Sequence, residues 1–336
     1  MLERNDADKL AGCLVGGAIG DAIGLPLEGI RRRRAARMFV PPLRYRSLFG
    51  RGMVSDDTEH ACVAALALAR CRGDEERFVR GVASGLRAWL CTLPAGAGLA
   101  TLRATMKLCV GVSPRRSGVR SAGNGAAMRA AILGAYFGED RAALRRFVDA
   151  SSRVTHTDER AVDGAYLIAL AASGHEAVFR EPGVVATSCW NFDVLDRMLA
   201  EGASPALFAQ ALGLGEGVGG FVAHTVPVAL YCATWAGEDF RSGVEAAAAL
   251  GGDSDTLCAI VGGILGARVG YAGLPDEWVS GLWEWPRSVS WMRRLANSLA
   301  AGTPPPTTFW PAYLARSPLF IGTVLTHGFR RLLPPY

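Results

Sequence analysis

Lysine is almost absent from this 336-residue chain: Lys9 and Lys107 are the only lysines among 36 basic residues, and arginine supplies the rest. With 31 acidic residues, the formal net charge is +5. This arginine bias, together with abundant alanine and glycine, is typical of a GC-rich genome rather than of a nucleic-acid-binding surface. The one dense basic run, Arg31–Arg34 with Arg37, has no aromatic platform beside it. We therefore predict a solvated surface turn there and no nucleic-acid partner.

Paired metal-binding cysteines and histidines are also missing. The eight cysteines never form a C-x-x-C pair, and the five histidines never form an H-x-x-x-H pair, so the usual zinc spacings are excluded. Most of the cysteines lie in apolar stretches. This distribution predicts small buried side chains in a reducing compartment.

No uninterrupted apolar run is long enough to cross a membrane. The stretch Ala11–Leu27 contains Asp21 and several glycines, and acidic residues among the first eight positions are unlike a signal peptide. A second apolar stretch, Leu319–Phe329, is shorter than the roughly 20 residues that a span requires. We therefore expect a packed C-terminal helix at 319–329, no membrane partner and a cytoplasmic location.

Continuous β-branched runs are nearly missing, and so is the G-x-G-x-x-G signature of dinucleotide folds, which disfavours an α/β sheet. Alanine and leucine at helical spacing instead predict helices at Ala61–Ala69, Ala126–Phe137, Ala161–Ala172, Val226–Ala236 and Thr256–Val269. The fold is therefore predicted to be all-α. The composition changes near Trp283, where tryptophans and a proline run appear. We predict a main helical domain over residues 1–282 and an appendage over 283–336 packed on it.

Two aspartate-rich motifs precede predicted helices. They are Ser55-Asp56-Asp57-Thr58 and Gly251-Gly252-Asp253-Ser254-Asp255-Thr256. Either motif alone is well explained as a helix cap, but a cap needs only one such side chain, and adjacent negative charges repel. If the motifs converge, a cation must lie between them. Carboxylate and hydroxyl oxygens suit Mg²⁺, Mn²⁺ or Ca²⁺, and four carboxylates are enough for two ions.

Five motifs together resemble the ADP-ribosylglycohydrolase family in content and order. They are Gly12–Glu28, Ser55–Thr58, Gly123–Arg129, Thr155-His156 and Gly251–Thr256, and the similarity runs from about residue 10 to about residue 275. This resemblance implies a compact single-domain orthogonal helical bundle. It also implies two Mg²⁺ or Mn²⁺ ions and cleavage of the bond between the anomeric carbon of ADP-ribose and an arginine, a serine or a small acyl group.

The resemblance also implies roles for the acidic residues. The expected metal ligands are Ser55, Asp56, Asp57, Asp253, Asp255 and Thr256. Glu28 would be the general base or a metal-coupled switch near the scissile bond, with the ions binding the ribose hydroxyls and a metal-bound water attacking C1′. Asp57 is the alternative base, because a metal-ligating carboxylate can also orient the water.

The substrate side is expected to be built by a glycine-rich loop and a histidine. Ser121, Gly123, Asn124 and Gly125 precede a predicted helix, so their N–H groups would cradle the diphosphate. His156 resembles the family histidine near the diphosphate and ribose. The segment Gly217–Gly219, ahead of His224-Thr225-Val226-Pro227, is expected to form another wall of the pocket.

The expected partner is an ADP-ribosylated protein or a small ADP-ribose conjugate, and the protein is expected to be a monomer. Arginine-linked ADP-ribose is favoured, with serine-linked and O-acyl substrates left open. Three other functions remain open. They are a non-catalytic ADP-ribose-binding protein, a metal-dependent phosphoesterase, and a cysteine hydrolase using His60 or His156, although no local signature supports the last.

Overall fold

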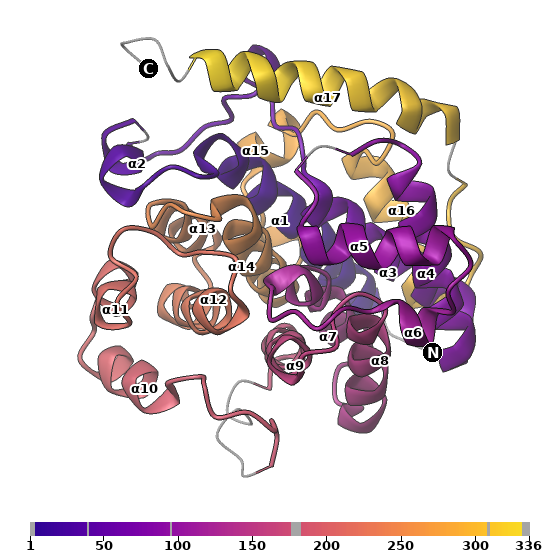
Figure 1. Ribbon diagram of the computed structural model, residues 1–336. Helices are drawn as coiled ribbons and strands as arrows, with labels where there is room; N and C mark the ends of the chain where they lie inside the picture. Colours follow the sequence, from indigo (N-terminus) through magenta and orange to yellow (C-terminus); the bar gives the residue numbers. More distant parts are fainter. Residues whose placement is uncertain (1–3, 39, 95, 176–182, 308–309, 331–336) are drawn as a thin grey trace.

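The computed structural model describes residues 4–38, 40–94, 96–175, 183–307 and 310–330, and within these ranges the chain folds entirely into helices and loops (Figure 1). The α-helices are α1 (Arg4–Gly24), α2 (Arg32–Met38), α3 (Asp56–Cys71), α4 (Glu75–Leu90), α5 (Leu99–Cys109), α6 (Pro114–Ser117), α7 (Ala131–Phe137), α8 (Arg141–Arg153), α9 (Glu159–Ser173), α10 (Phe192–Ala200), α11 (Pro205–Ala211), α12 (Val222–Ala236), α13 (Phe240–Ala248), α14 (Ser254–Val269), α15 (Asp276–Gly281), α16 (Val289–Ala301) and α17 (Trp310–Arg330). Short 3₁₀ helices are η1 (Leu25–Leu27), η2 (Leu48–Gly50), η3 (Asn124–Arg129) and η5 (Tyr271–Gly273). The described residues form isolated β-bridges but no strand, so the all-α prediction is confirmed.

Four of the five internal helix predictions fall inside observed helices, namely α3, α9, α12 and α14, and the C-terminal prediction falls inside α17. The predicted helix at 126–137 is wrong in one respect, because the chain forms η3 and then α7 there. The Arg129 side chain donates to the carbonyl oxygen of Gly125 at 2.6 Å, which is the acceptor that an α-helix would offer to its own backbone. The basic run expected as a surface turn is the short helix α2, and its arginines are largely exposed.

Helices α1 and α14 form the centre of the fold and approach each other through glycine. A Cβ atom on Gly12 would lie 2.1 Å from the carbonyl oxygen of Gly266, and one on Gly20 would lie 2.0 Å from that of Cys258. Gly16 and Gly24 make similar approaches. The four glycines recur every fourth residue, so they share one face of α1. The two helices run antiparallel and in backbone contact, which brings the end of α1 to the beginning of α14.

The segment Asp6–Leu27, most of which is α1, has the length and apolar composition of a membrane span, but 94% of its apolar stretch is buried inside the protein. That burial is the environment of a core helix. Helices α7, α9, α12, α13 and α16 pack around the α1–α14 pair.

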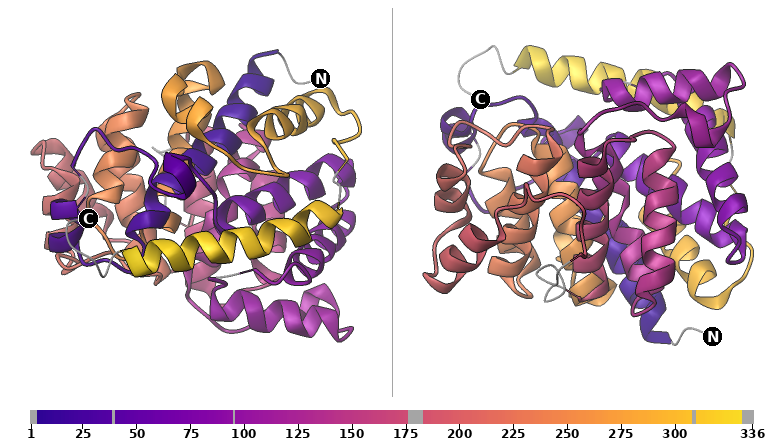
Figure 2. Two further views of the ribbon diagram at one scale, coloured as in Figure 1. Left: turned by 90° about the horizontal axis from the view of Figure 1, so that it is seen from above. Right: turned by 60° about the horizontal axis from the view of Figure 1, so that its bottom comes forward.

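The described part of the segment 283–336 packs closely on the rest of the protein. Helix α16 lies against α1 and α3. Helix α17 runs along one side of the molecule, where Phe320 packs with Leu25 and Met53 (Figure 1, Figure 2). Helix α17 thereby lies over the loops that follow α1 and lead to α3. The boundary between a main domain and an appendage stays a prediction.

Candidate active site

The two aspartate motifs lie at the beginnings of α3 and α14 and touch each other. The hydroxyl of Thr256 donates to Oδ2 of Asp57 at 3.2 Å, although the two residues are 199 positions apart. The hydroxyl of Ser55 donates to the same oxygen at 3.1 Å. The antiparallel α1–α14 pair explains the meeting, because it fixes the beginning of α14 beside the loops that leave α1 and enter α3.

A cavity of about 310 Å³ opens at this junction. The predicted site residues that line it are Glu28, Asp56, Ser121, Gly123, Asn124, Gly125, His156, Asp253, Asp255 and Thr256. The remaining two, Ser55 and Asp57, are buried beneath it and bonded to each other. The twelve predicted catalytic, metal-ligating and substrate-binding residues are therefore in the cavity wall or directly behind it.

Capping explains only part of these motifs. Ser55 is the N-cap of α3, and its hydroxyl oxygen accepts from the backbone N–H of Asp57. Asp253 occupies the N-cap position of α14 but makes no side-chain cap bond. Its Oδ2 instead accepts a 2.7 Å hydrogen bond from the side-chain amide of Asn124. The carboxylates of Asp56, Asp57 and Asp253 are thus not used to cap the beginnings of these helices and are available to bind a ligand.

The carboxylates are close enough to repel one another. Burial and then the charges of Asp21, Asp56 and Asp253 raise the pKa of Asp57 well above its usual range. Burial, followed by the charges of Glu28, Asp57 and Asp253, does the same to the pKa of Asp255. Neighbouring acids whose pKa values are raised by burial and mutual repulsion are a common sign of a functional site.

Two buried oxygens at the junction have no hydrogen-bond donor, namely Oδ1 of Asp57 and Oδ1 of Asp255. Buried acceptors without partners are uncommon in folded proteins and call for an explanation such as an ion. Among the described residues, no group of three or more Asp, Glu, His or Cys side chains is arranged so that it could hold a metal ion by itself. The hydroxyls of Ser55 and Thr256 belong to the same oxygen-rich set.

Asp21 is a member of this site that sequence reasoning missed. This fully buried carboxylate on α1 accepts bonds from the backbone N–H groups of Ser55 and Thr58 and from the Thr58 hydroxyl, the last at 2.6 Å. Burial raises the pKa of Asp21 to about 6, although these hydrogen bonds oppose the rise. Asp21 therefore holds the first turn of α3 in place from the neighbouring helix α1. The one signal in the sequence was a lone acid within an apolar, glycine-rich helix.

Two glycines shape the turn before Asp253. Gly251 and Gly252 have φ values of +69° and +88°, and a Cβ on Gly252 would lie 2.2 Å from the carbonyl oxygen of Val218. Other residue types therefore do not fit there. Gly252 exchanges backbone bonds with Gly29 and Ile30, which ties the Glu28 loop to the second aspartate motif.

The segment Gly217–Gly219 lies behind this turn rather than in the cavity. Val218 is buried, and its carbonyl oxygen accepts from the backbone N–H of Asp253 at 2.7 Å. The neighbouring Gly220 lines the cavity. The predicted pocket wall is therefore displaced by one residue, while 217–219 supports the aspartate turn.

His156 stands against the glycine loop on the opposite wall. A Cβ on Gly125 would lie 2.9 Å from Cε1 of the imidazole, and one on Gly123 would lie 3.5 Å from Nε2. The Nδ1 atom of His156 bonds with the Thr155 hydroxyl at 2.8 Å. Burial and then the positive charge of Arg129 lower the pKa of His156 to about 3. The imidazole is consequently neutral at physiological pH.

Arg129 is a second residue without a role assigned from the sequence. Its guanidinium is fully buried and donates to Gly125 O, to the side chain and carbonyl of Ser151, and to the Thr155 hydroxyl. All of these acceptors are uncharged. Arg129 therefore joins the glycine loop to the segment that carries His156 and places a positive charge behind this wall of the cavity.

Comparison with known proteins points to one family. Residues 2–307 match the ADP-ribosylglycohydrolase family. An uncharacterized protein of Archaeoglobus fulgidus is 32% identical over 292 residues, which cover 82% of this chain and 92% of that protein. A solved structure described as an ADP-ribosylglycohydrolase-related protein complex is similar with a TM-score of 0.60 and 25% sequence identity, covering 90% of this chain and all of that one.

Proposed function

Because this chain belongs to the ADP-ribosylglycohydrolase family, whose members are glycohydrolase-type enzymes, we propose that it hydrolyses the glycosidic bond between ADP-ribose and an acceptor with the help of two divalent cations. The observation that carries the proposal is the convergence of both aspartate motifs, Glu28 and the glycine loop on one cavity. A capping role for each motif alone does not require that convergence.

The residues that would hold the ions are Ser55, Asp56, Asp57, Asp253, Asp255 and Thr256. The donor set is entirely oxygen, which suits Mg²⁺ or Mn²⁺. The unpartnered Oδ1 atoms of Asp57 and Asp255 fit such ions, since a cation would satisfy both and relieve the repulsion among the carboxylates. When bound, the ions supply Lewis-acid charge that polarises substrate oxygens.

Glu28 is the better of the two candidate bases. It follows η1 at the cavity wall, with an exposed side chain that an attacking water can reach. Asp57 is 2% exposed, and one of its oxygens is already bonded to two hydroxyls. In the proposed reaction Glu28 takes the proton of the water that attacks C1′, the bond from C1′ to the acceptor breaks, and that proton is returned to the departing acceptor. Asp57 would serve as an ion ligand.

The opposite wall would bind the ADP-ribose itself. The glycine loop exposes backbone beside His156, because no Cβ stands between Gly125 and the imidazole. Ser121 and the neutral His156 offer hydrogen-bonding groups to ribose and diphosphate oxygens. Arg129 adds favourable charge for a diphosphate without touching it. The Asn124–Asp253 bond would keep this wall in register with the ions.

The test is a linkage panel with ADP-ribosyl-arginine, ADP-ribosyl-serine and O-acetyl-ADP-ribose, each with Mg²⁺ or Mn²⁺ and each with EDTA. We expect release of ADP-ribose from at least the arginine conjugate. We also expect EDTA and the Asp253→Ala, Asp255→Ala double variant to reduce release to the background rate. Full activity of the EDTA-treated double variant would exclude the two-ion mechanism.

The same panel separates the alternatives. A non-catalytic family member would bind ADP-ribose and metal but turn over none of the three linkages. A phosphoesterase would instead release inorganic phosphate or a nucleotide from a nucleoside diphosphate. The retained acids and Glu28 favour the hydrolase, and the family favours cleavage at the glycosidic carbon.

A further inference from the structure

We propose that Arg316 of α17, together with Glu284, is a positioning residue for the first aspartate motif: the pair holds the backbone at Val54 so that Asp56 and Asp57 face Asp255. The inference deepens the proposed function, on which it rests, by identifying what keeps one half of the ion site in place. It assigns a role to the C-terminal helix.

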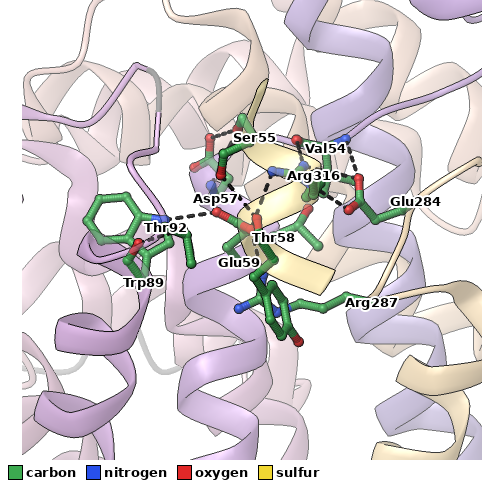
Figure 3. A network of polar contacts seen from close by, with 12 residues as sticks. Val54, Ser55, Asp57, Thr58, Glu59, Trp89, Thr92, Glu284, Arg287 and Arg316 are labelled. Atoms are coloured by element: carbon green, nitrogen blue, oxygen red, sulfur yellow. Dashed lines mark hydrogen bonds and ion pairs between the residues drawn. The ribbon is translucent and has the colours of Figure 1, made fainter. Parts of the chain in front are cut away.

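The main chain at Val54 is held on both sides. Arg316 donates from Nη2 to the Val54 carbonyl oxygen at 2.5 Å, and Glu284 accepts from the Val54 N–H at 3.3 Å. The two side chains are also paired with each other, with Arg316 Nε 2.6 Å from Glu284 Oε1. Val54 directly precedes Ser55, the N-cap of α3 (Figure 3). A displacement at Val54 would therefore be passed to the two aspartates that follow.

The same arginine reaches the helix beyond the aspartates. Arg316 Nη1 lies 3.4 Å from Oε1 of Glu59, and Arg287 donates to that oxygen at 2.6 Å. The other oxygen of Glu59 accepts from the indole N–H of Trp89 at 2.8 Å. Residues on both sides of Asp56 and Asp57 are thus fixed by one network (Figure 3).

The network is buried and balanced in charge. Glu59, Glu284, Arg287 and Arg316 are each 7% exposed or less, so two negative and two positive side chains share one interior region. The desolvation cost of burying ionised groups is often not recovered even when each of them has a partner. The network therefore adds little net stability to α3, which already has Ser55 as its N-cap and Asp21 as a further hydrogen-bond acceptor. Its effect is instead geometric, because it fixes a single position of the chain from 54 to 59.

Arg316 lies outside the family match, which ends at residue 307. Glu284, Arg287 and Glu59 lie inside it. The guanidinium that contacts the Val54 carbonyl is therefore supplied by a segment beyond the matched region. The residues of the cavity are predicted by the family motifs, whereas the contact between Arg316 and Val54 is seen only in the fold of this chain.

The experiment measures geometry and ion binding separately from turnover. Hydrogen exchange of the backbone over residues 53–59 reports the hold on Val54, and titration with Mn²⁺ reports the ion site. The test variants are Arg316→Met, Arg316→Lys and the double variant Glu284→Gln, Arg316→Met. The double variant removes both members of the buried pair, so it remains informative if the single Met variant folds poorly because Glu284 is left unpaired.

Two variants serve as controls. Ser317→Ala removes a hydroxyl on the same helix that, among the described residues, donates to the carbonyl of Tyr313 within α17. Arg145→Met removes an ion-paired arginine from α8, where Arg145 contacts Asp163. Both should leave Mn²⁺ affinity and exchange over 53–59 as in the wild-type protein.

We expect Arg316→Met and the double variant to lower Mn²⁺ affinity by about 10- to 100-fold, the usual effect of losing support behind a metal ligand. Exchange over 53–59 should accelerate, while exchange in the α1–α14 pair stays unchanged. Arg316→Lys, which keeps the charge and one donor, should recover part of both losses.

The proposal is overturned if a folded Arg316→Met or double variant keeps wild-type Mn²⁺ affinity and wild-type exchange over 53–59. It is also overturned if the control variants cause the same losses, since α17 would then act only through general stability. Exchange needs neither metal nor substrate. A wild-type protein that releases no ADP-ribose would thus refute the proposed function, while selective acceleration at 53–59 would still support the positioning role.

Discussion

Asn124 and Asp253 join the two walls of the cavity: the side-chain amide of Asn124 donates to Oδ2 of Asp253 at 2.7 Å and to the Thr225 hydroxyl at 3.1 Å. One oxygen of Asp253 is thereby oriented by the residue at the centre of the glycine loop. Binding of a ligand at the glycine loop and binding of an ion to Asp253 would consequently affect each other.

The first prediction concerns this bond. Asn124→Asp replaces the amide donor with a second carboxylate facing Asp253, whereas Asn124→Ala only removes the donor. We expect the Ala variant to lower Mn²⁺ affinity by about 10-fold and the Asp variant to lower it further, because like charges add repulsion to the lost bond. Calorimetric titration checks the order. Equal affinities in wild type and both variants would contradict an orienting role for Asn124.

The second prediction tests the glycine contact between α1 and α14. Gly20→Ala places a methyl group 2.0 Å from the Cys258 carbonyl oxygen, so the helices must separate. Forced overpacking of this kind costs typically about 1–3 kcal/mol, and more where backbone must move. Gly17→Ala on the same helix meets its nearest atom at 3.5 Å and is the matched control. Urea unfolding should rank Gly20→Ala well below wild type and Gly17→Ala at or above it.

A third prediction separates stability from ion binding at Asp255. Asp255→Asn removes one member of a group of mutually repelling buried acids, so without metal the variant should unfold at a higher temperature than wild type. Mn²⁺ at about 100 times its dissociation constant should stabilise wild type by about 2.7 kcal/mol and the variant much less. Thermal unfolding with and without Mn²⁺ measures both. A metal-induced shift of the same size in the variant would exclude Asp255 as a ligand.

The fourth prediction is a pH dependence caused by His156. Its pKa is about 3 in the folded protein and 6.5 for an ordinary histidine, so the unfolded chain binds the extra proton between these values. Its contribution to stability is therefore present above pH 6.5 and is lost as the pH falls toward 3. Between pH 7 and pH 5 the wild type should lose about 2 kcal/mol more than His156→Gln does. Subtracting the variant cancels the opposite effect of the buried acids, and a pH-independent difference would contradict the assignment.

Helical spacing predicted most of the helices because that pattern is encoded locally, whereas most residues of the cavity wall were selected through the resemblance to a family. Helical spacing gave the α3, α9, α12 and α14 cores, and each short motif carries its own chemistry. The placement of Glu28 beside Asp255 was inferred from similarity to a family, since nothing in the spacing of residues 28 and 255 predicts that they meet.

The supporting residues could not be predicted in this way. Asp21, Arg129 and Arg316 act through partners in other elements, and a single acid or arginine in a helix has no pattern that predicts its partner. Arg129 also explains the error at 126–137, where a side chain takes a backbone acceptor and the helix begins late. Helix propensity reflects bonding of the backbone to itself. Here the Arg129 side chain, which also bonds to Ser151 and Thr155, takes the Gly125 carbonyl instead.

The bond between Arg316 and Val54 spans 262 positions of the sequence. During translation the first aspartate motif therefore leaves the ribosome well before α17. Until α17 emerges, the Val54 carbonyl lacks this donor, so a nascent chain that already includes Thr256 has both aspartate motifs but not the Arg316 contact. Under the proposed positioning role, we expect a chain that stops directly after residue 307, where the family match ends, to fold its core yet bind divalent ions more weakly.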